Sequence, residues 1–520
     1  MLTRAARPLA SVLLALLLAG CVTTVPGSPA PRESGWTFVG EEPCDDAGVV
    51  GADEFSCVTL SVPVDHAEPT GEHWDVTFGL RRADGDSRGV LVTATGGPGS
   101  SGLSVADLYL GSRYPAAVAE QYDTVFFDQR GIGLSQEFRC DDTYYGSFAE
   151  TVDTSSTAAD RTAYAEAATT FGQECFTEAG VDPATAPRYA TRQAVEDLED
   201  FREWLGAPAL VLYGESYGTQ YVQTYAAAHP DRVERVVVDG VVDLTTDIQD
   251  FALGSARADS EILARTLLSC DTQPACADEA PGTSLAAYDE LQARLAAEPV
   301  TLDDGTVVDE VTLKSAAFGW ISDPYSRTEL QVAVNEAVLG DYSALVDLAE
   351  DGGGFGPTDD FSDALFYAVE CQDYDFVPQG GDGAAALDGW LDRAAAEGVD
   401  QLRLGDYYYG DTPCHFWPGV ADSPDVPRPA PVTDPPYPVL VVNADADPNT
   451  PVAGALGVFR DLTPGQGPED ALVLLQGGFH VVWGAGDPCV DGPVDAFVLE
   501  GTVPAERFTN CPGDIADPYP

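Results

Sequence analysis

The chain has 520 residues, of which 44% are hydrophobic, so it is long enough to bury a large core. It carries 86 acidic and 25 basic side chains, and the formal net charge of −61 argues against nucleic-acid binding, because such a surface repels phosphate backbones. The acidic residues are spread along the chain, which indicates a solvated surface and not one specific ligand site.

The amino terminus has the pattern of a bacterial lipoprotein signal. Two arginines precede an apolar run over residues 9–18, and the sequence LAGC ends at Cys21. The run is shorter than the ~20 apolar residues that a membrane-spanning helix needs. We therefore expect a signal peptide over residues 1–20, a lipid on Cys21, and a tether over residues 21–36 that holds an extracytoplasmic domain at the bacterial cell membrane.

A glycine-rich loop follows the first strongly apolar strand pattern. The strand is predicted over residues 90–94, and the loop TGGPGSSG occupies residues 95–102. Taken alone, this loop is a plain turn. Beside a reacting carbonyl, its glycines let the backbone approach closely, and the N–H of Gly97 is the best donor because Pro98 has none.

A serine stands between a predicted strand and a predicted helix. The apolar run over residues 209–213 leads into GESYG at residues 214–218. A Gly-x-Ser-x-Gly turn of this kind exposes the serine as a nucleophile. The pattern alone is weak evidence in a chain with 52 glycines, so Ser216 needs a base and an acid at matching positions.

A long helical stretch separates this serine from the next strand signal. Apolar residues recur at helical spacing over residues 328–339 and 342–349. The stretch is too long for a simple crossover between strands. We expect a first core part over residues 37–242, a helical cap insert over residues 243–432, and a second core part over residues 433–520.

An acidic loop follows the strand predicted over residues 438–442. Asp447 is the first choice for the catalytic acid and Asp445 the second. Asp239, which follows an earlier strand, is a third candidate, although a loop-capping role suits it better. The acidic loop resembles the start of a calcium loop, but Thr450 stands where a glycine is needed, so calcium is disfavoured.

The chain contains five histidines, and one of them is placed as a base should be. His480 follows a strand predicted over residues 472–475 and a glycine-rich turn, which would present its imidazole at the carboxyl end of a sheet. The others are interpreted as structural: His66, His73, His229 and His415. We predict that His480 is the base.

The remaining cysteines suggest disulfides. Eleven cysteines minus Cys21 leave ten, an even number that fits complete pairing in an oxidising compartment. Their connectivity does not follow from sequence, but proximity favours Cys44 with Cys57, Cys140 with Cys175, Cys270 with Cys276, Cys371 with Cys414, and Cys489 with Cys511. Metal binding is disfavoured, because no C-x-x-C pair and no metal-spaced histidines occur.

Three motifs together resemble a known family. GGPG at residues 96–99, DQRGIGLS at residues 128–135 and GESYG are similar to the proline iminopeptidase and tripeptidyl aminopeptidase branch of the α/β-hydrolases. The part from DPNTP at residues 447–451 onward is similar to the domain that ends secreted tripeptidyl aminopeptidases.

The resemblance implies an α/β-hydrolase fold, with a mostly parallel sheet, helices on both faces and a helical cap insert. It also implies a triad in the order Ser216, Asp447, His480, and a cap that restricts access to chain ends. The departures from the family pattern are Thr95 before the double glycine and Phe479 before the histidine.

We predict a serine hydrolase that releases residues or short peptides from free amino termini through an acyl-enzyme. The N–H groups of Gly97 and Tyr217 would form the oxyanion hole. The carboxylates predicted to bind the substrate amine are those of Glu215, Glu370 and Asp373.

The alternatives are an esterase or lipase with the same triad, and a non-catalytic surface binding protein. The expected partners are a peptide substrate and, through the lipid only, a membrane. Neither a cofactor nor a metal is expected, and the oligomeric state is left open.

Overall fold

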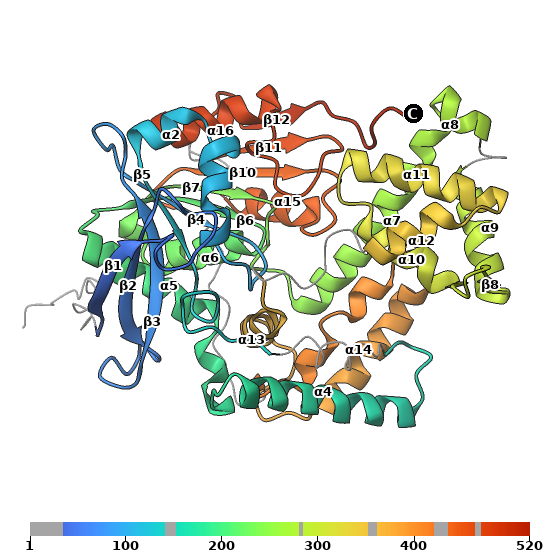
Figure 1. Ribbon diagram of the computed structural model, residues 1–520, viewed down its shortest axis with the longest axis horizontal. Coiled ribbons are helices and arrows are strands. Elements are labelled where there is room, and N and C mark those ends of the chain that lie inside the picture. Colours follow the sequence, from blue (N-terminus) through green and yellow to red (C-terminus); the bar gives the residue numbers. More distant parts are fainter. Residues whose placement is uncertain (1–34, 141–151, 280–283, 352–360, 421–434, 463–469) are drawn as a thin grey trace, which may run out of the picture. The chain divides into compact units, whose positions relative to one another are not determined.

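The computed structural model describes residues 35–140, 152–279, 284–351, 361–420, 435–462 and 470–520 (Figure 1). The predicted signal peptide, Cys21 and the tether up to residue 34 lie outside the described residues. None of the described helices is both long enough and apolar enough to span a bilayer.

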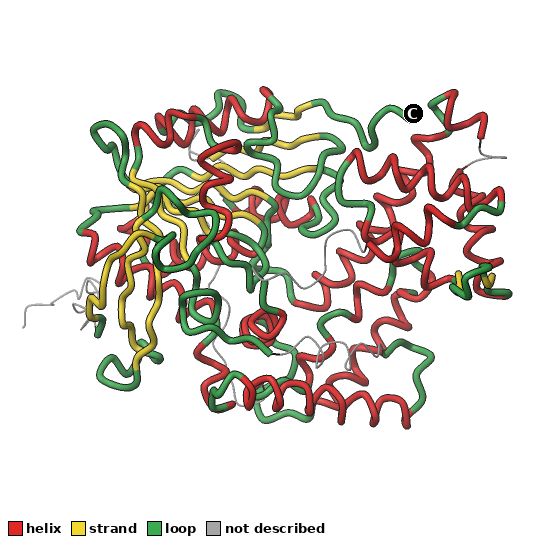
Figure 2. Tube along the Cα trace, viewed as in Figure 1, coloured by secondary structure: helices red, strands yellow, loops and turns green. Residues whose placement is uncertain are grey.

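Most strands belong to one large sheet. The described strands are β1 (Thr37–Pro43), β2 (Ser56–Pro63), β3 (His73–Arg81), β4 (Val90–Ala94), β5 (Asp123–Phe127), β6 (Leu210–Glu215), β7 (Val233–Asp239), β8 (Val300–Thr301), β9 (Val307–Val308), β10 (Val439–Ala444), β11 (Asp470–Leu475) and β12 (Phe508–Cys511). Ten of them form a sheet in the order β1-β2-β3-β5-β4-β6-β7-β10-β11-β12 (Figure 2). All pairs from β5 to β12 in this order are parallel, and the pairs from β1 to β5 are antiparallel. The predicted mostly parallel sheet is confirmed.

Helices connect and cover the strands. The described α-helices are α1 (Ala106–Leu108), α2 (Ala116–Gln121), α4 (Ala158–Glu178), α5 (Thr191–Leu205), α6 (Tyr217–Ala228), α7 (Ile248–Cys270), α8 (Pro274–Glu279), α9 (Ser284–Ala297), α10 (Glu310–Gly319), α11 (Pro324–Leu339), α12 (Ser343–Asp351), α13 (Asp363–Asp373), α14 (Gly383–Glu397), α15 (Val452–Asp461) and α16 (Pro488–Glu500).

The central strands are buried on both faces, as the continuous apolar runs predict. Leu210 and Leu212 of β6 belong to one core cluster with residues of α5, α6 and α15. Val211 and Tyr213, which alternate with them, belong to a second cluster with residues of α2 and α16. Helices therefore pack on both faces of the sheet, which confirms the predicted fold class.

A helical segment lies between β7 and β10 in the chain. Helices α7 and α9 to α12 share a separate hydrophobic core that includes Leu263, Leu291, Leu313, Leu330 and Leu345. The two stretches with helical periodicity form parts of α11 and α12. The segment falls within residues 243–432, and its role as a cap stays a prediction.

Helix α4 comes before the serine in the chain but packs with the later helical segment. Its Tyr164 hydroxyl lies 2.6 Å from the Thr412 hydroxyl, and Arg161 lies 2.6 Å from Asp388 of α14. Figure 1 shows α4 running beside α14. The helical region is thus built from chain segments on both sides of β6.

The ten described cysteines form five disulfides. The pairs are Cys44–Cys57, Cys140–Cys175, Cys270–Cys276, Cys371–Cys414 and Cys489–Cys511, which are those that sequence proximity predicts. Disulfides at this density are typical of extracytoplasmic proteins, because the cytosol keeps thiols reduced.

Candidate active site

Ser216 occupies a strained turn between β6 and α6. Its backbone has φ 55° and ψ −129°, a combination that costs a non-glycine residue about 1–3 kcal/mol. A Cβ atom on Gly218 would lie 1.9 Å from the Ala94 carbonyl oxygen, and one on Gly214 would lie 2.3 Å from the Gly218 oxygen. The two glycines are therefore needed for the turn to close, and the turn lifts the serine out of the strand.

Asp447 and His480 are in direct contact. Each follows a strand of the parallel sheet, β10 and β11, and the carboxyl ends of parallel strands meet at one edge. His480 Nδ1 lies 2.9 Å from Asp447 Oδ2 and 3.0 Å from Oδ1. Asp447 is 1% exposed and also accepts hydrogen bonds from the Asn449 and Thr450 backbone N–H groups and from the Thr450 hydroxyl. The carboxylate is thereby held in place as an acceptor for the imidazole.

The surroundings of His480 favour its protonated form. Burial lowers the pKa of His480, but the charge and hydrogen bond of Asp447, with smaller contributions from Glu215 and Asp239, outweigh burial and raise the pKa above its usual value. A base of this kind accepts a proton readily and keeps it while a substrate bond breaks.

Ser216 and His480 border the same turn at the end of β7. The Ser216 N–H donates to the Asp239 carbonyl oxygen at 3.0 Å. A Cβ atom on Gly240 would lie 2.9 Å from His480 Cε1, so the imidazole lies directly over this glycine. The serine and the imidazole are thus both placed at the end of one strand.

Of the three candidate acids, Asp447 is the one that contacts the imidazole. The Asp445 carboxylate accepts the Gly477 N–H at 2.7 Å and pairs with Arg265 at 2.9 Å. It therefore holds the turn before His480 and does not reach the ring. The catalytic roles of Ser216, Asp447 and His480 stay predictions.

Asp239, the third candidate acid, holds the turn after the histidine. Its carboxylate accepts the N–H groups of Val482 at 3.1 Å and Trp483 at 2.8 Å. From the other side, Arg113 donates to the carbonyl oxygens of Val481 and Trp483, each at 3.1 Å. Val481 has φ 63°, a strained value for a β-branched residue. The two charged side chains keep the strained turn in place.

The glycine-rich loop lies against the serine. A Cβ atom on Gly96 would lie 2.8 Å from Ser216 Cβ and 3.1 Å from Ser216 Oγ, so the close approach requires glycine. Gly97 and Tyr217, the predicted oxyanion donors, directly follow these two residues in the chain. Their role as donors stays a prediction.

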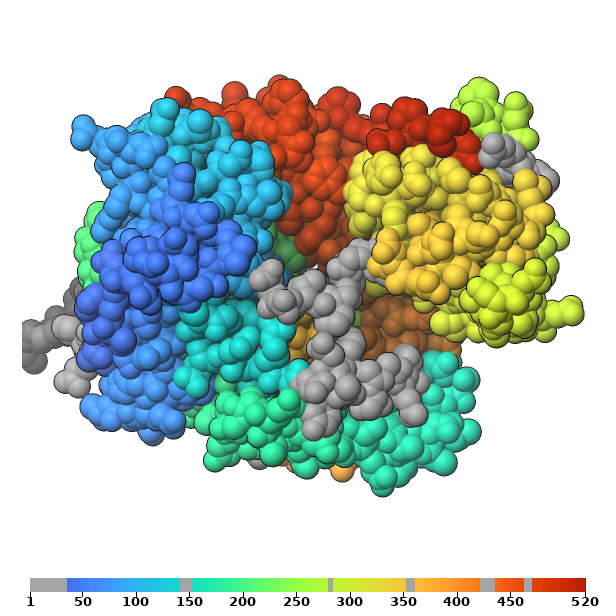
Figure 3. Space-filling view, viewed as in Figure 1, coloured from blue at the N-terminus to red at the C-terminus, as the bar shows by residue number. Residues whose placement is uncertain are grey.

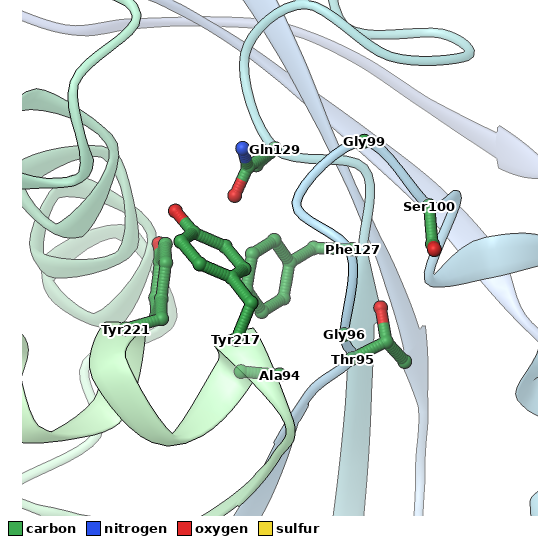
Figure 4. A pocket seen from close by; sticks show the side chains of 9 residues that line it. All are labelled: Ala94, Thr95, Gly96, Gly99, Ser100, Phe127, Gln129, Tyr217 and Tyr221. Carbon is green, nitrogen blue, oxygen red and sulfur yellow. The ribbon is translucent and has the colours of Figure 1, made fainter. Parts of the chain in front are cut away.

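A pocket opens beside this loop. It is lined by Ala94, Thr95, Gly96, Gly99, Ser100, Phe127, Gln129, Tyr217 and Tyr221 (Figure 4). Thr95 and Gly96 lie on one side of it, and Tyr217 and Tyr221 lie on the other. Aromatic rings and small residues of the glycine-rich loop therefore make up much of the lining of this pocket.

Glu215, one of the predicted amine-binding residues, points into the core. It is 8% exposed and accepts hydrogen bonds from the hydroxyl groups of Tyr109 and, at 3.3 Å, Tyr213. It does not line the pocket beside the serine. The charge of its carboxylate contributes to the raised pKa of His480.

The other two predicted carboxylates, Glu370 and Asp373, are on α13 beside Tyr217. Asp373 accepts hydrogen bonds from Thr191 N at 2.9 Å and from Gln220 Nε2 at 2.7 Å. Burial raises the pKa of the Tyr217 hydroxyl, and the charges of Asp373 and Glu370 raise it further. Both carboxylates are thus close enough to act on the residue that follows Ser216.

Asp259 on α7 is a further acidic residue, not predicted from the sequence, whose charge interacts with that of Asp447. It is fully buried, and neither carboxylate oxygen has a hydrogen-bond partner among the described residues. Burial, with the charge of Asp447, raises the pKa of Asp259 well above its usual range. Burial also raises the pKa of Tyr407, and the charges of Asp411, Asp259 and Glu370 add to this effect. Acidic groups from several elements therefore gather around Tyr407.

The remaining histidines have structural partners. His415 is buried, hydrogen-bonds the Thr412 carbonyl oxygen at 2.9 Å, and has its pKa lowered by burial to about 4. His66 Nε2 lies 2.7 Å from Asp197, and His229 Nε2 lies 3.1 Å from Glu196.

Known proteins resemble this chain over most of its length. A family model described as "alpha/beta hydrolase fold" matches residues 89–281, and one described as "TAP-like protein" matches residues 402–511. The serine protease Hip1 of Mycobacterium tuberculosis is 27% identical over 521 residues, which cover 94% of each chain. The tripeptidyl aminopeptidase of Streptomyces lividans is 26% identical over 88% of this chain and 84% of its own. Carboxylesterase B of Mycobacterium tuberculosis is 26% identical over 97% of this chain and 99% of its own.

The two family models cover the segments that contain Ser216, Asp447 and His480, and the relatives align with nearly the whole chain. The chain therefore belongs to the α/β-hydrolase fold family and is a serine hydrolase with a TAP-like carboxyl-terminal part.

Proposed function

We propose that Ser216, His480 and Asp447 hydrolyse peptide bonds through an acyl-enzyme. The observation that carries this proposal is the 2.9 Å contact between His480 Nδ1 and Asp447 Oδ2 at the sheet edge where Ser216 is lifted out of its strand. His480 takes the proton of Ser216 Oγ as that oxygen attacks the substrate carbonyl carbon, and gives it to the leaving amine. Water then enters, loses a proton to His480 and attacks the acyl carbon; as the bond to Ser216 Oγ breaks, His480 returns the proton to that oxygen and the carboxylic acid departs.

The negative charge that forms on the substrate oxygen needs donors that are already in place. We assign this role to the N–H groups of Gly97 and Tyr217, because Gly96 packs against Ser216 and Tyr217 begins helix α6. The amino-terminal end of a helix adds a favourable dipole for an anion.

The substrate specificity we propose is for a free amino terminus. A protonated amine needs a fixed carboxylate, and the α13 residues Glu370 and Asp373 act electrostatically on Tyr217, next to the nucleophile. Glu215 is a weaker candidate, because it is buried on the face of β6 that Tyr213 shares, with the hydroxyl groups of Tyr109 and Tyr213 donating to it. One of the relatives is a tripeptidyl aminopeptidase, which also supports cleavage near a free amino terminus.

Asp259 is the fourth candidate for the amine. A buried carboxyl group with no hydrogen-bond partner is unfavourable, and an ammonium ion would supply both a donor and a compensating charge. Its electrostatic interaction with Asp447 indicates that Asp259 is near the triad acid.

The proposed location is the outer face of a bacterial membrane, with a lipid on Cys21. The LAGC pattern ending at Cys21 and the five disulfides support it. Replacing Cys21 by Ser should release the protein from the membrane fraction, because the lipid is the proposed attachment. Unchanged retention would contradict the lipid anchor.

An esterase is the second candidate function, because acyl transfer to a triad serine does not distinguish amides from esters and one relative is a carboxylesterase. The deciding experiment compares a tripeptide chromogenic amide with a free amino terminus, the same compound acetylated, and a short neutral ester. Of the two amides, we expect only the one with a free amino terminus to be cleaved well. Equal cleavage of both amides, or cleavage of the ester alone, would reject the aminopeptidase.

Replacing each candidate carboxylate by its side-chain amide then identifies the residue that binds the substrate amine. Glu370→Gln, Asp373→Asn and Asp259→Asn are compared with Asp347→Asn, which changes an exposed acid on α12. Loss of the amine contact should lower kcat/KM for the free tripeptide about ten- to a hundredfold, as for a lost charge-assisted hydrogen bond, and leave ester hydrolysis unchanged. Parallel losses on the two substrates would mean that the residue supports the fold and not the amine.

A further inference from the structure

Arg327, at the start of helix α11, is fully buried without an acidic hydrogen-bond partner. Its Nε donates to the Ile321 carbonyl oxygen at 2.7 Å. Its two terminal nitrogens donate to the carbonyl oxygens of Gly478 and Ala446, each at 2.6 Å, and of Ile515 at 3.2 Å. In the described part of the chain, all its hydrogen-bond acceptors are backbone carbonyl groups.

Two of these carbonyl groups belong to the loops that carry the proposed acid and base. Ala446 directly precedes Asp447, and Gly478 is two residues before His480. The planar guanidinium group has its donors in a rigid fork, so it fixes the two loops relative to each other. A lysine, with one nitrogen on a flexible stem, cannot reproduce this geometry.

The turn before His480 depends on such support. Gly477 and Gly478 have φ values of 62° and 72°, and neither has a side chain that could anchor the turn. The anchors are instead external: Asp445 accepts the Gly477 N–H at 2.7 Å, and Arg327 binds the Gly478 oxygen. On the carbonyl side, the Gly477 oxygen accepts the Ala446 N–H at 3.1 Å, and without Arg327 the Gly478 oxygen, which is nearer to His480, would lose its donor.

Helix α11 belongs to the helical segment between β7 and β10 and not to the sheet. Figures 1 and 3 show α11 next to the carboxyl-terminal part of the chain. Thr328, the next residue, donates to the Asp517 carbonyl oxygen at 2.9 Å and strengthens this junction. Arg327 thus reaches from the helical segment to the edge of the sheet where the proposed acid and base lie.

A buried cation that donates only to carbonyl groups is costly, because these dipoles do not fully replace water, although the charges of Asp323, Asp447 and Asp445 offset part of this cost. Burial lowers the pKa of Arg327 to about 10, so the side chain still carries its charge at neutral pH. An apolar residue of similar length would fill the space at a lower cost. The charge lies beside both loops, and a role in holding them would explain why an arginine occupies this position.

We propose that Arg327 is a positioning residue that keeps Asp447 and His480 within hydrogen-bonding distance of each other. Catalysis then depends on the position of helix α11. The inference rests on the proposed function, because it assigns a role to the contact between the proposed acid and base. It adds that the helical segment supports the chemistry itself as well as the selection of substrate.

The test compares Arg327→Met and Arg327→Lys in the full chain with Arg235→Met. Arg235 is also buried and donates to a backbone carbonyl, that of Val498, but it is near the start of β7, away from the catalytic edge. The measurements are the rate at which a fluorophosphonate labels Ser216, kcat and KM, the low-field proton resonance of the His480–Asp447 hydrogen bond, and Tm.

We expect Arg327→Met to lower kcat and the labelling rate about ten- to a hundredfold with little change in KM, because a small misplacement of a base has a large effect on rate. The low-field resonance should weaken or disappear. Arg327→Lys should recover part of the rate, and Arg235→Met should lower Tm without slowing labelling of the folded protein.

A folded Arg327→Met protein with the normal labelling rate would overturn the inference. If this variant does not fold, Arg327→Lys decides, since normal kcat with one nitrogen in place of the fork would also overturn it. Failure of the unmodified chain to be labelled at Ser216 would instead reject the proposed function, so the two failures are distinguishable.

Discussion

The carboxylate of Asp239 accepts the backbone N–H of Trp483 at 2.8 Å, and this contact joins the end of strand β7 to the turn that follows His480. Its second oxygen accepts the Val482 N–H at 3.1 Å. Val481 between these residues and the histidine has φ 63°, so the turn is strained and needs a fixed partner. The residue that sequence patterns offer as an alternative acid therefore supports the base by a different route.

Replacing Asp239 by Asn should lower kcat about tenfold and leave KM nearly unchanged, because one amide oxygen cannot accept both N–H groups and the amide NH₂ would face a donor. Steady-state kinetics on the free tripeptide tests this expectation. Asp231→Asn, which changes an exposed acid before β7, is the control. Unaltered kcat in a folded Asp239→Asn protein would show that the turn holds without this contact.

Replacing Ser216 by Ala should abolish hydrolysis and fluorophosphonate labelling while the protein stays folded, because the change removes one hydroxyl group from a turn that Gly214 and Gly218 define. The measurement is labelling followed by peptide mapping. Ser100→Ala, which removes the hydroxyl group of a serine that lines the neighbouring pocket, should still be labelled. Label on a different serine of the unmodified protein would mean that the nucleophile is elsewhere.

Asp447→Asn should reduce kcat by about 10⁴, since an amide does not hold the imidazole in the useful tautomer. Asp445→Asn removes the ion pair with Arg265 and weakens a single turn contact, so its effect should be far smaller. Kinetics of the two variants, with circular dichroism to verify folding, compares neighbouring acids in one loop. Equal losses would leave the acid unassigned.

The pH profile should reflect the raised pKa of His480. Burial lowers this pKa, but Asp447 and the more distant carboxylates outweigh burial, so the net shift is upward from 6.5. The base works when neutral, and kcat/KM should therefore rise with pH and reach half its maximum above pH 6.5. An acid limb centred below that value would contradict the assignment.

Protonation of Asp239 should make kcat/KM fall more steeply on the acid side of the same pH profile. Burial raises the pKa of Asp239 to about 6, although the N–H groups of Trp483 and Val482 oppose the shift. Below pH 6 the carboxyl group gains a proton and is a weaker acceptor for the turn. Asp239→Asn should remove this second titration, which fitting the profile with one or two protons would detect.

The Cys371–Cys414 disulfide should affect specificity, because it ties α13, with Glu370 and Asp373, to the segment around Thr412. Changing both cysteines to Ser should raise KM for the free tripeptide and leave the neutral ester unaffected. The control replaces Cys44, which directly follows β1, and Cys57 of β2. Each pair contributes about 2–4 kcal/mol to stability, so both changes should lower Tm. A KM that does not change with the first pair would argue that α13 is held by packing alone.

The proposed triad could be inferred from sequence because its determinants are local. Ser216 is marked by the two glycines that its turn requires, and Asp447 and His480 each follow a short apolar run. Parallel strands bring such positions to one edge, so a one-dimensional pattern is enough to group them. The direct Asp447–His480 hydrogen bonds follow from that grouping.

The supporting charges could not be inferred in the same way. Arg327 binds the carbonyl group of Ala446, which is 119 residues away, and any residue type offers a carbonyl group. The sequence gives only weak evidence that Asp259 is buried: it shares a helix face with Ile262 and Leu263, which are buried. The evidence for Glu215 is clearer, since strand alternation places it on the same face as Tyr213 and thus toward the core.

The packing of α4 means that the helical region proposed to select the substrate is built from two separate parts of the chain. Tyr164 and Arg161 find their partners in Thr412 and Asp388, so an exchange of residues 243–432 between relatives would leave one long helix against a foreign surface. A working chimaera needs residues 158–178 transplanted together with the later segment. By the same reasoning, natural divergence of specificity in such chains should show as paired changes on both sides of the nucleophile strand.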